Sequence, residues 1–414
     1  MEKKLTIAII GLGSRGADSY GQIINKDPRF DITAICDLRP VKLERFEKEF
    51  GIKKENCFLD ENEFFKTKLA NVCIIATQDK DHVRHCLAAL KLGYDILLEK
   101  PITPDLDECY KLLEAQKKYG GRVIVCHVLR YAPAYNKLDE LLKSGVIGKL
   151  INIHAIEQVQ YWHQAHSYVR GNWRKSEETS PMIMAKCCHD LDLIQHYAGS
   201  KCKVVSSVGE LSFFKRENQP EGASDRCSTC KYKDTCVYSA YKIYVGLWEK
   251  HGCPASSWPQ NVVTSVVPLT KEAIVEGIEN TNYGQCVFAC DNNVVDHQET
   301  NILFENGVTA NLLMTGFTYH GGRHYIFHGT HGEIDFDEPH DTISILKFGE
   351  EPQILPFNSL VDINGGHGGG DQGIVNDVYK VFALNEEATT TLTESLESHI
   401  IAIKAEQDRI NNLK

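Results

Sequence analysis

Residues 5–16 read LTIAIIGLGSRG, an apolar run followed at once by three spaced glycines. The run 5–10 is typical of a buried parallel strand, and G-x-G-x-x-G after such a strand is a dinucleotide-binding pattern. Gly11 permits the tight turn, Gly13 the approach of a pyrophosphate, and Gly16 close packing of helix on strand. The stretch predicts a dinucleotide site at a helix N-terminus; the alternative is a glycine-rich turn that binds nothing. The residues assigned to it are Gly11, Gly13, Ser14, Arg15 and Gly16.

An acidic residue stands where a ribose would be recognised. Asp37 ends the next apolar run, about 20 residues beyond the glycines, and a carboxylate there accepts hydrogen bonds from the ribose hydroxyls of NAD. The alternative is that Asp37 caps the helix that begins after Leu38-Arg39-Pro40. Arg39 or Arg15 could hold a 2′-phosphate, which keeps NADP as the second choice of cofactor.

The first part of the chain alternates short apolar runs with helical patterns. This alternation predicts βαβ units and a parallel, doubly wound sheet, the α/β Rossmann class, over residues 1–126. The expected strands are 5–10, 32–36, 72–76, 96–98 and 123–126, and the clearest helices are 82–92 and 106–118.

The pattern changes to period-two alternation in residues 127–414, which predicts an α+β domain with a large, open, mostly antiparallel sheet. The expected strands include 307–314, 324–328 and 342–347, and the expected helices include 182–197 and 392–411. A Cys-rich, turn-rich stretch at about 219–260 interrupts this pattern as an insertion. A sheet with one open face favours association of copies through this domain, as a dimer or tetramer.

Composition excludes several classes of protein. The chain has 414 residues, 42% of them hydrophobic, and a formal net charge of −11 without a basic run, so a nucleic-acid partner is not expected. No segment approaches the roughly 20 apolar residues that cross a bilayer, and no secretory leader is recognised. The 15 cysteines then indicate a reducing, cytoplasmic location.

A second motif lies at the end of the expected strand 96–98, where open α/β sheets bind ligands. Residues 97–101 read LLEKP, and together with the glycine pattern they resemble the glucose-fructose oxidoreductase, inositol dehydrogenase and MocA family over essentially the whole chain. The resemblance implies an NAD(P)-dependent oxidoreductase acting on a CH–OH group of a sugar, cyclitol or other polyol. It also implies that Lys100 assists proton transfer; the alternative is a surface lysine paired with Glu99. We assign Thr77, His82, Glu99 and Lys100 to the cofactor site as well.

The family's second catalytic element is a helix with Asp and, four residues later, His. Residues 184–190 read MAKCCHD, so His189 matches the family histidine, a candidate base for the substrate hydroxyl. Ala185 occupies the aspartate position, so the resemblance does not extend to that carboxylate. Lys186 is the candidate for a replacement charge.

Aromatic, imidazole and guanidinium groups crowd the segment after residue 160. Flat rings with polar edges suit stacking on sugars, and ring donors suit hydroxyls. The alternatives are ordinary buried aromatics, or a metal held by His163 and His166. The proposed substrate-binding residues are Tyr161, Trp162, His163, His166, Arg170, Trp173 and His189, with His127, Arg130 and Tyr131 after the last Rossmann strand.

The insertion carries four cysteines, Cys227, Cys230, Cys236 and Cys253. Four thiolates suit tetrahedral zinc, our first choice, while free thiols and an iron–sulfur cluster are the alternatives. We expect the insertion to lack an apolar core of its own, so that a structural metal would order it.

Two further readings of the function stay open. A redox glycosidase would oxidise its sugar transiently, eliminate the substituent and reduce the product without net consumption of NAD. A non-catalytic NAD sensor would keep the scaffold for regulation. The glycine-rich loop 365–371 is either a ligand contact or a hinge before the last helices.

Overall fold

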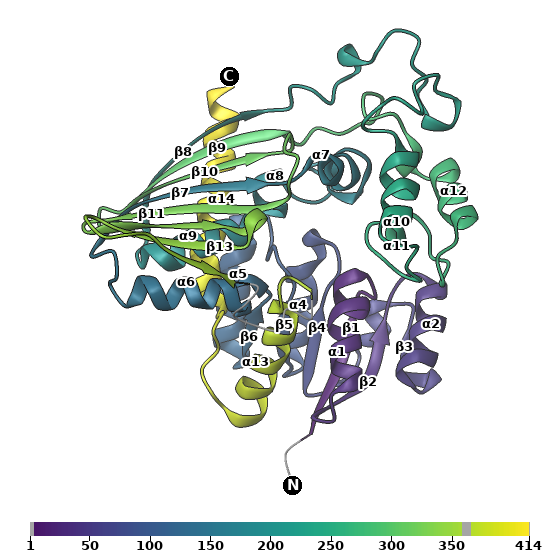
Figure 1. The fold of residues 1–414 in the computed structure, drawn as a ribbon. Coiled ribbons are helices and arrows are strands. Elements are labelled where there is room, and N and C mark those ends of the chain that lie inside the picture. The colour runs from purple at the N-terminus through teal and green to yellow at the C-terminus, as the bar shows by residue number, and fades with distance from the viewer. Residues whose placement is uncertain (1–3, 358–365, 414) are drawn as a thin grey trace.

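Two β-sheets organise the chain (Figure 1). The computed structural model describes residues 4–357 and 366–413. The first part of the chain forms a parallel sheet flanked by helices, and the second forms a larger sheet crossed on one side by the long C-terminal helix. Within the described residues no helix is both long and apolar enough to cross a membrane.

The first sheet is the expected Rossmann sheet. Its strands are all parallel, in the order β3-β2-β1-β4-β5-β6. They are β1 (Leu5–Ile10), β2 (Phe30–Cys36), β3 (Cys57–Phe58), β4 (Val72–Ile75), β5 (Asp95–Leu98) and β6 (Val123–Val125). The helices between them are α1 (Gln22–Lys26), α2 (Pro40–Phe50), α3 (Glu61–Phe64), α4 (His82–Lys91) and α5 (Leu106–Tyr119). A π-helical segment, η1 (Ser14–Gly21), precedes α1.

The second sheet is mostly antiparallel, as expected, in the order β14-β13-β12-β11-β7-β10-β9-β8; only β7 and β10 pair in parallel. Its strands are β7 (Leu150–Gln158), β8 (Cys202–Glu210), β9 (His297–Phe304), β10 (Thr309–Thr315), β11 (Gly322–Gly329), β12 (Gly332–Asp337), β13 (Thr342–Lys347) and β14 (Gln353–Pro356). Alternate residues of these strands are buried, for example Tyr325 and Phe327 of β11, so one face meets the core and the other stays open.

Helices α6 (Pro133–Lys143), α8 (Met182–Ala185), α9 (Cys188–Ala198) and α14 (Leu392–Asn412) accompany this sheet. The single helix expected over 182–197 is wrong in one respect: it is broken between α8 and α9, at Lys186 and Cys187. The buried face of α9 and α14 shares one core with the first sheet, which contains Leu98, Leu191, Phe327 and Ile401. The two halves therefore pack together through one continuous hydrophobic core.

Helix α13 (Gly370–Leu384) returns to the first sheet. Its apolar side chains, including Ile374, Val378 and Phe382, share a core with Leu5 and Ile7 of β1. After it, the backbone N–H of Val125 in β6 donates to Thr390 O (3.1 Å). By its packing α13 thus belongs to the first half, although it lies far beyond residue 126, where the sequence places the boundary.

The insertion and the residues that follow it hold the short helices α10 (Leu247–Lys250), α11 (Gln260–Val263) and α12 (Lys271–Asn280), drawn at the right of Figure 1. Contrary to expectation, the insertion contributes to an apolar core: its Tyr244 is buried in a cluster with Phe214, Ile274 and Phe288 from either side of it. Its aromatic residues are spread over some 75 positions, so no single stretch of the sequence shows the hydrophobic content. Folding of the insertion therefore does not depend on a metal alone.

Candidate active site

The glycine turn has the form that the motif requires. Gly11 has φ +93°, and a Cβ at Gly16 would lie 2.0 Å from Gly11 O, so neither position has room for a side chain in this conformation. A Cβ at Gly13, by contrast, would meet nothing within 4 Å. The open space above Gly13 and the N-terminus of η1 form a cradle of the kind that holds a pyrophosphate.

Asp37 lies beside this cradle and is almost fully buried. Its Oδ2 accepts from Leu12 N (2.8 Å), and its Oδ1 accepts from the backbone and Nε of Arg39 (both 2.9 Å). Burial raises the pKa of Asp37, but the hydrogen bonds from Arg39 outweigh it and the pKa is lowered. The carboxylate is thus ionised at neutral pH, and it orders both the glycine turn and the half-exposed Arg39.

Arg15 does not point toward the place of a 2′-phosphate, because it is paired with two carboxylates. Its Nε donates to Glu99 Oε1 (2.8 Å) and its Nη2 to Asp371 Oδ1 (2.8 Å), while Ser19 Oγ donates to Asp371 Oδ2 (2.7 Å). Arg15 therefore links the glycine turn, the end of β5 and the start of α13. Both of its carboxylate partners are buried, so the guanidinium balances their charge rather than facing solvent.

Lys100 points toward the helix break at α8. Its Nζ donates to Ala185 O at 3.1 Å, the backbone of the residue that replaces the family aspartate. Glu99, the alternative partner, instead accepts from the Lys100 backbone N–H (2.9 Å) through Oε2 and from Arg15 through Oε1. The amino group is thus free of the adjacent carboxylate.

Two histidines hold the segment after Lys100 in place. The imidazole of His82 lies between Pro101 O (2.7 Å from Nδ1) and Thr77 O (3.2 Å from Nε2). His399 of α14 accepts from Ile102 N through Nε2 (2.8 Å) and contacts Ser395 O through Nδ1 (2.7 Å). His82, assigned to the cofactor from the sequence, is therefore occupied by backbone carbonyls, and His399 is a support that the sequence did not reveal.

Two other imidazoles lie next to that of His189. Its ring centre lies 6.0 Å from that of His127 and 6.2 Å from that of His367, and Nδ1 of His189 has no hydrogen-bond partner in the structure as described. Burial lowers the pKa of His189 well below its usual value, and the nearby positive charge of Lys100 adds to this. Burial likewise lowers the pKa of His127 to about 3. Both rings are therefore neutral at pH 7 and can accept a hydrogen bond.

His367 reaches this group from the glycine-rich loop, of which residues 366–371 are described and Gly365 lies outside the described residues. His367 has φ +54°, and its Nδ1 lies 3.1 Å from Asp371 Oδ1. Because a carboxylate only accepts, Nδ1–H donates, and Nε2 is left as an acceptor. The sequence marked this loop as unusual without assigning His367 a role.

A buried ion cluster lies behind the histidines. Lys186 Nζ is 3.1 Å from Glu157 Oε1, and Arg323 Nη2 is 2.9 Å from Glu157 Oε2. Arg323 Nε also donates to Asp190 Oδ1 (2.9 Å), the residue next to His189. Burial and the neighbouring Glu157 raise the pKa of Asp190. Lys186, a predicted catalytic residue, is thus neutralised by Glu157 and fixes the helix break.

The aromatic segment forms part of the wall. The rings of Trp162, His163 and Trp258 pack together, with centres 5.3 Å apart for the two tryptophans and 4.8 Å for His163 and Trp258. Burial lowers the pKa of His163 well below its usual value, and the charges of Lys186 and Lys100 act in the same direction, so this ring borders the same region. His166 packs against Trp258 as well, at 5.2 Å between ring centres, and on its other side stacks on Tyr283 at 5.0 Å.

Other predicted substrate residues are paired with neighbouring side chains, and Arg130 shares the carboxylate of Asp192 with His127. Trp173 Nε1 donates to Asp79 (3.2 Å), and Tyr131 OH donates to Asp377 (2.9 Å). Arg130 Nη1 is 3.6 Å from Asp192, and Tyr161 packs on Tyr238. Arg170 lines a cavity of the insertion. The structure thus brings together the histidines of this group with His163 and Lys100, but not the whole set.

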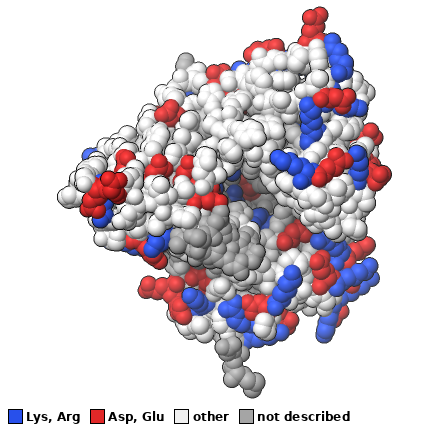
Figure 2. Space-filling model, in the orientation of Figure 1, with Lys and Arg blue, Asp and Glu red and all other residues white. Residues whose placement is uncertain are grey.

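Figure 2 shows that this face of the molecule is hollowed near its middle, with basic and acidic atoms inside the hollow. The hollow lies between the upper sheet and the lower Rossmann sheet of Figure 1. Such a position, beyond the carboxyl ends of parallel strands, is where this type of sheet binds ligands.

The predicted metal ligands do not all meet. Cys227, Cys230 and Cys236 line one cavity, whereas Cys253 is exposed and is not among the residues that line it. Across residues 4–357 and 366–413, no group of three or more Cys, His, Asp or Glu side chains is placed to hold a metal ion. This holds for the cysteines and for the pair His163 and His166. The set of four proposed from the sequence is therefore corrected at Cys253.

Comparison with protein families gives two matches that together span most of the chain. Residues 5–127 match the NAD-binding Rossmann fold of an oxidoreductase family, GFO_IDH_MocA. Residues 139–356 match the C-terminal alpha/beta domain of the same family.

Individual proteins agree with this. The oxidoreductase YteT of Bacillus subtilis is 23% identical over 90% of this chain and 88% of its own length. An inositol 2-dehydrogenase/D-chiro-inositol 3-dehydrogenase of Lactiplantibacillus plantarum is 28% identical over 34% of this chain and 41% of its own. Among solved structures, levoglucosan dehydrogenase in complex with NADH and levoglucosan has a TM-score of 0.69 at 16% identity, over 99% of this chain and 98% of that one. At that identity the likeness shows the fold.

Proposed function

Since the chain belongs to the GFO_IDH_MocA oxidoreductase family, we propose that it is an NAD(P)-dependent dehydrogenase of a sugar, cyclitol or related polyol. The observation that carries the proposal is the meeting of Lys100, His189, His127 and His367 beside the dinucleotide cradle. Neutral rings with unused nitrogen atoms next to a lysine are suited to binding and deprotonating a hydroxyl group.

The residues present fit a nicotinamide dinucleotide. The empty space above Gly13 has room for a pyrophosphate, and the ionised Asp37 suits ribose hydroxyls, which favours NAD. Because Arg15 is already paired with Glu99 and Asp371, Arg39 is the residue that would remain for a 2′-phosphate. When bound, the nicotinamide supplies a hydride acceptor or donor.

Proton transfer falls to this chain's own residues. We assign the substrate hydroxyl to Nδ1 of His189, which lacks a partner in the part of the chain described, and to Lys100. Lys100 Nζ donates to Ala185 O and forms no ion pair with a carboxylate among the described residues, so we assign the proton taken from the hydroxyl to the neutral ring of His189, which passes it on to solvent. The carboxylate of the family relay is replaced by the buried Lys186–Glu157 pair, which positions the histidine helix.

Several acceptors around one lysine favour a substrate with several hydroxyls. Nε2 of His367 and one ring nitrogen of the neutral His127 can each accept a hydrogen bond, the other nitrogen of His127 can donate one, and His163 and Trp162 offer ring faces at the wall. A polyol satisfies such a set, whereas an apolar alcohol would leave buried nitrogens unpaired.

One observation keeps a redox-neutral glycosidase as the second candidate. Ala185 removes the carboxylate from the expected relay, and an extra imidazole, His367, faces the site. An additional base suits elimination next to a transiently oxidised carbon.

We also propose a homo-oligomer. The second sheet ends at the edge strands β8 and β14, and these strands expose the apolar residues Val204, Val208 and Ile354, which a second copy could cover.

The test is incubation of the purified protein with NAD⁺ or NADP⁺ and a panel of sugars, cyclitols and aryl glycosides. Reduced nicotinamide and released aglycone are measured together. A dehydrogenase forms NADH that Lys100→Ala abolishes, while Lys117→Ala, an exposed lysine of α5, does not. Aglycone release without net NADH would replace the proposal by the glycosidase, and bound NADH without turnover on any substrate would favour the sensor.

A further inference from the structure

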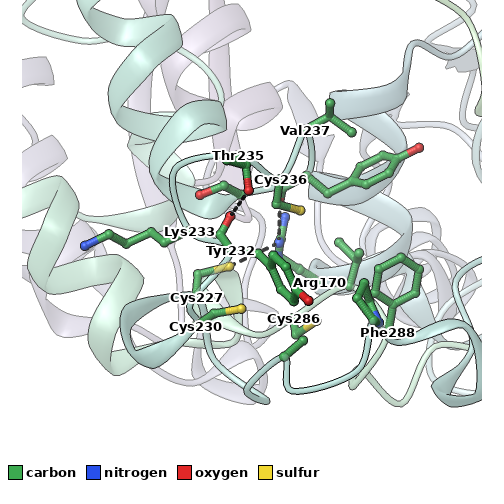
Figure 3. A pocket seen from close by; sticks show the side chains of 15 residues that line it. Arg170, Cys227, Cys230, Tyr232, Lys233, Thr235, Cys236, Val237, Cys286 and Phe288 are labelled. Carbon is green, nitrogen blue, oxygen red and sulfur yellow. Dashed lines mark hydrogen bonds between the residues drawn. The ribbon is translucent and has the colours of Figure 1, made fainter.

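A cavity of about 360 Å³ lies under the insertion, apart from the histidine group. Four cysteines line it: Cys227, Cys230 and Cys236 come from the insertion, and Cys286 comes from the segment before β9 (Figure 3). The proposed dehydrogenase chemistry uses none of these thiols. The fold thus brings a fourth thiol, from some 50 residues further along the chain, to the cavity that the first three already line.

Arg170 supplies the second observation. Its side chain is 1% exposed and lies among the thiols in Figure 3. Nε donates to Gln285 O (2.8 Å) and Nη2 to Tyr238 O (2.7 Å), but Nη1 has no partner among the described residues.

A buried guanidinium without a counter-charge is costly, because desolvation of a cation is repaid only by a nearby anion. In residues 4–357 and 366–413 no carboxylate forms an ion pair with Arg170. The anion that this cavity can provide is thiolate sulfur: Arg170 Nη2 is 3.8 Å from Cys227 Sγ. The position of Arg170 thus indicates negative charge on the cysteines in the native protein.

The backbone around the cavity also suits thiolates. Ala240 N donates to Cys227 Sγ at 3.5 Å. Such N–H groups stabilise metal-bound sulfur.

We propose that Cys227, Cys230, Cys236 and Cys286 bind a thiophilic metal centre as thiolates, with Arg170 as its buried counter-charge. Zinc and an iron–sulfur cluster both take four thiolates, and either leaves the ligand set with net negative charge. On binding, the four thiols release their protons to solvent as the metal–sulfur bonds form, and the cysteine sulfurs are neither oxidised nor reduced.

The sulfurs surround the cavity without yet meeting at a single point. Each cysteine sulfur moves by rotation about one bond, χ1, among three staggered positions. Rotation about χ1 is the movement by which the sulfurs on the cavity wall would turn inward to meet on a metal centre. The fourth ligand is Cys286, in place of the exposed Cys253.

The first experiment measures zinc, iron and acid-labile sulfide in the full-length protein, purified without air and without chelators. We expect about one zinc per chain, or iron with matching sulfide and a broad visible absorption. A sample without these metals is titrated with Co²⁺, whose bond to thiolates gives an intense near-ultraviolet band. Folded protein that contains neither metal and gives no cobalt–thiolate band overturns the proposal.

Variants identify the ligands. Cys286→Ser is expected to lose most of the metal, while Cys253→Ser, the matched control, keeps it; Arg170→Met should weaken binding about tenfold, as loss of a supporting charge does. NADH binding, which depends on the Rossmann half, serves as the folding check and does not require the metal. Equal metal content in Cys286→Ser and the parent protein, or loss of metal in Cys253→Ser, refutes this ligand set.

Discussion

Substitution of Gly13 by alanine separates cofactor binding from stability. Gly13 has φ −83° and ψ −166°, which alanine adopts without strain, and the added Cβ would meet no atom of the protein within 4 Å. Gly→Ala at such a position should stabilise the fold by about 0.4 to 1 kcal/mol, because the unfolded chain loses freedom. The methyl group would instead fill the space that we assign to the pyrophosphate.

The methyl group is expected to weaken the binding of NADH. Moving a pyrophosphate off one backbone N–H loses a hydrogen bond to a charged group, about 1.5 to 3 kcal/mol, so the Kd for NADH should rise about tenfold or more. Fluorescence titration with NADH and a thermal melt of the same sample measure both effects. Gly16→Ala is the contrasting variant: its Cβ would lie 2.0 Å from Gly11 O, so it should lower stability by about 1 to 3 kcal/mol. A Gly13→Ala protein that melts normally and binds NADH with unchanged affinity would refute the assignment of the cradle.

Three further predictions concern the surroundings of the reaction. Asp37→Ser frees Arg39 from its carboxylate, so the preference for NAD⁺ over NADP⁺ in kcat/KM should fall at least about tenfold; an unchanged ratio would contradict the ribose assignment. Burial holds the pKa of His189 below 6.5, so its neutral, accepting form persists as pH falls, and kcat/KM should stay level from pH 8 to about 6.5 and decline only below. An acidic decline centred above pH 6.5 that disappears in His189→Gln would show the reverse. His367→Ala should lower kcat/KM for the polyol about tenfold with the Kd for NADH unaltered, since one substrate hydrogen bond is lost; equal kcat/KM would remove His367 from the site.

Local patterns predicted the local structures. Strands β1 and β13 have the bounds expected from their apolar and alternating residues, and the glycine turn was recognisable because its chemistry lies within six consecutive residues. β3 was missed because two residues are too few for a pattern. The break between α8 and α9 was missed because no glycine or proline marks it. It coincides with Lys186, whose partner Glu157 lies on a strand of the second sheet.

The site could be predicted only in part because it joins distant segments. Lys100 and His189 were proposed from motifs, whereas His367 lies in the loop before α13 and His399 lies in α14, more than 150 residues further along the chain. The same limit applied to the cysteines. Spacing suggested Cys253, which is nearest in the chain, while Cys286 is the one that shares the cavity. Composition could not show that convergence.

The return of α13 to the first sheet has a consequence for synthesis of the protein on the ribosome. The N-terminal half emerges first, but the apolar side of β1 that Ile374, Val378 and Phe382 cover stays exposed until α13 has been translated. During that interval the nascent Rossmann half presents an apolar surface of the kind that chaperones bind. A nascent chain stalled before residue 370 should therefore remain bound to chaperones, and the nucleotide-binding half is finished only when residues 370–384, and not the first 126 alone, have left the ribosome.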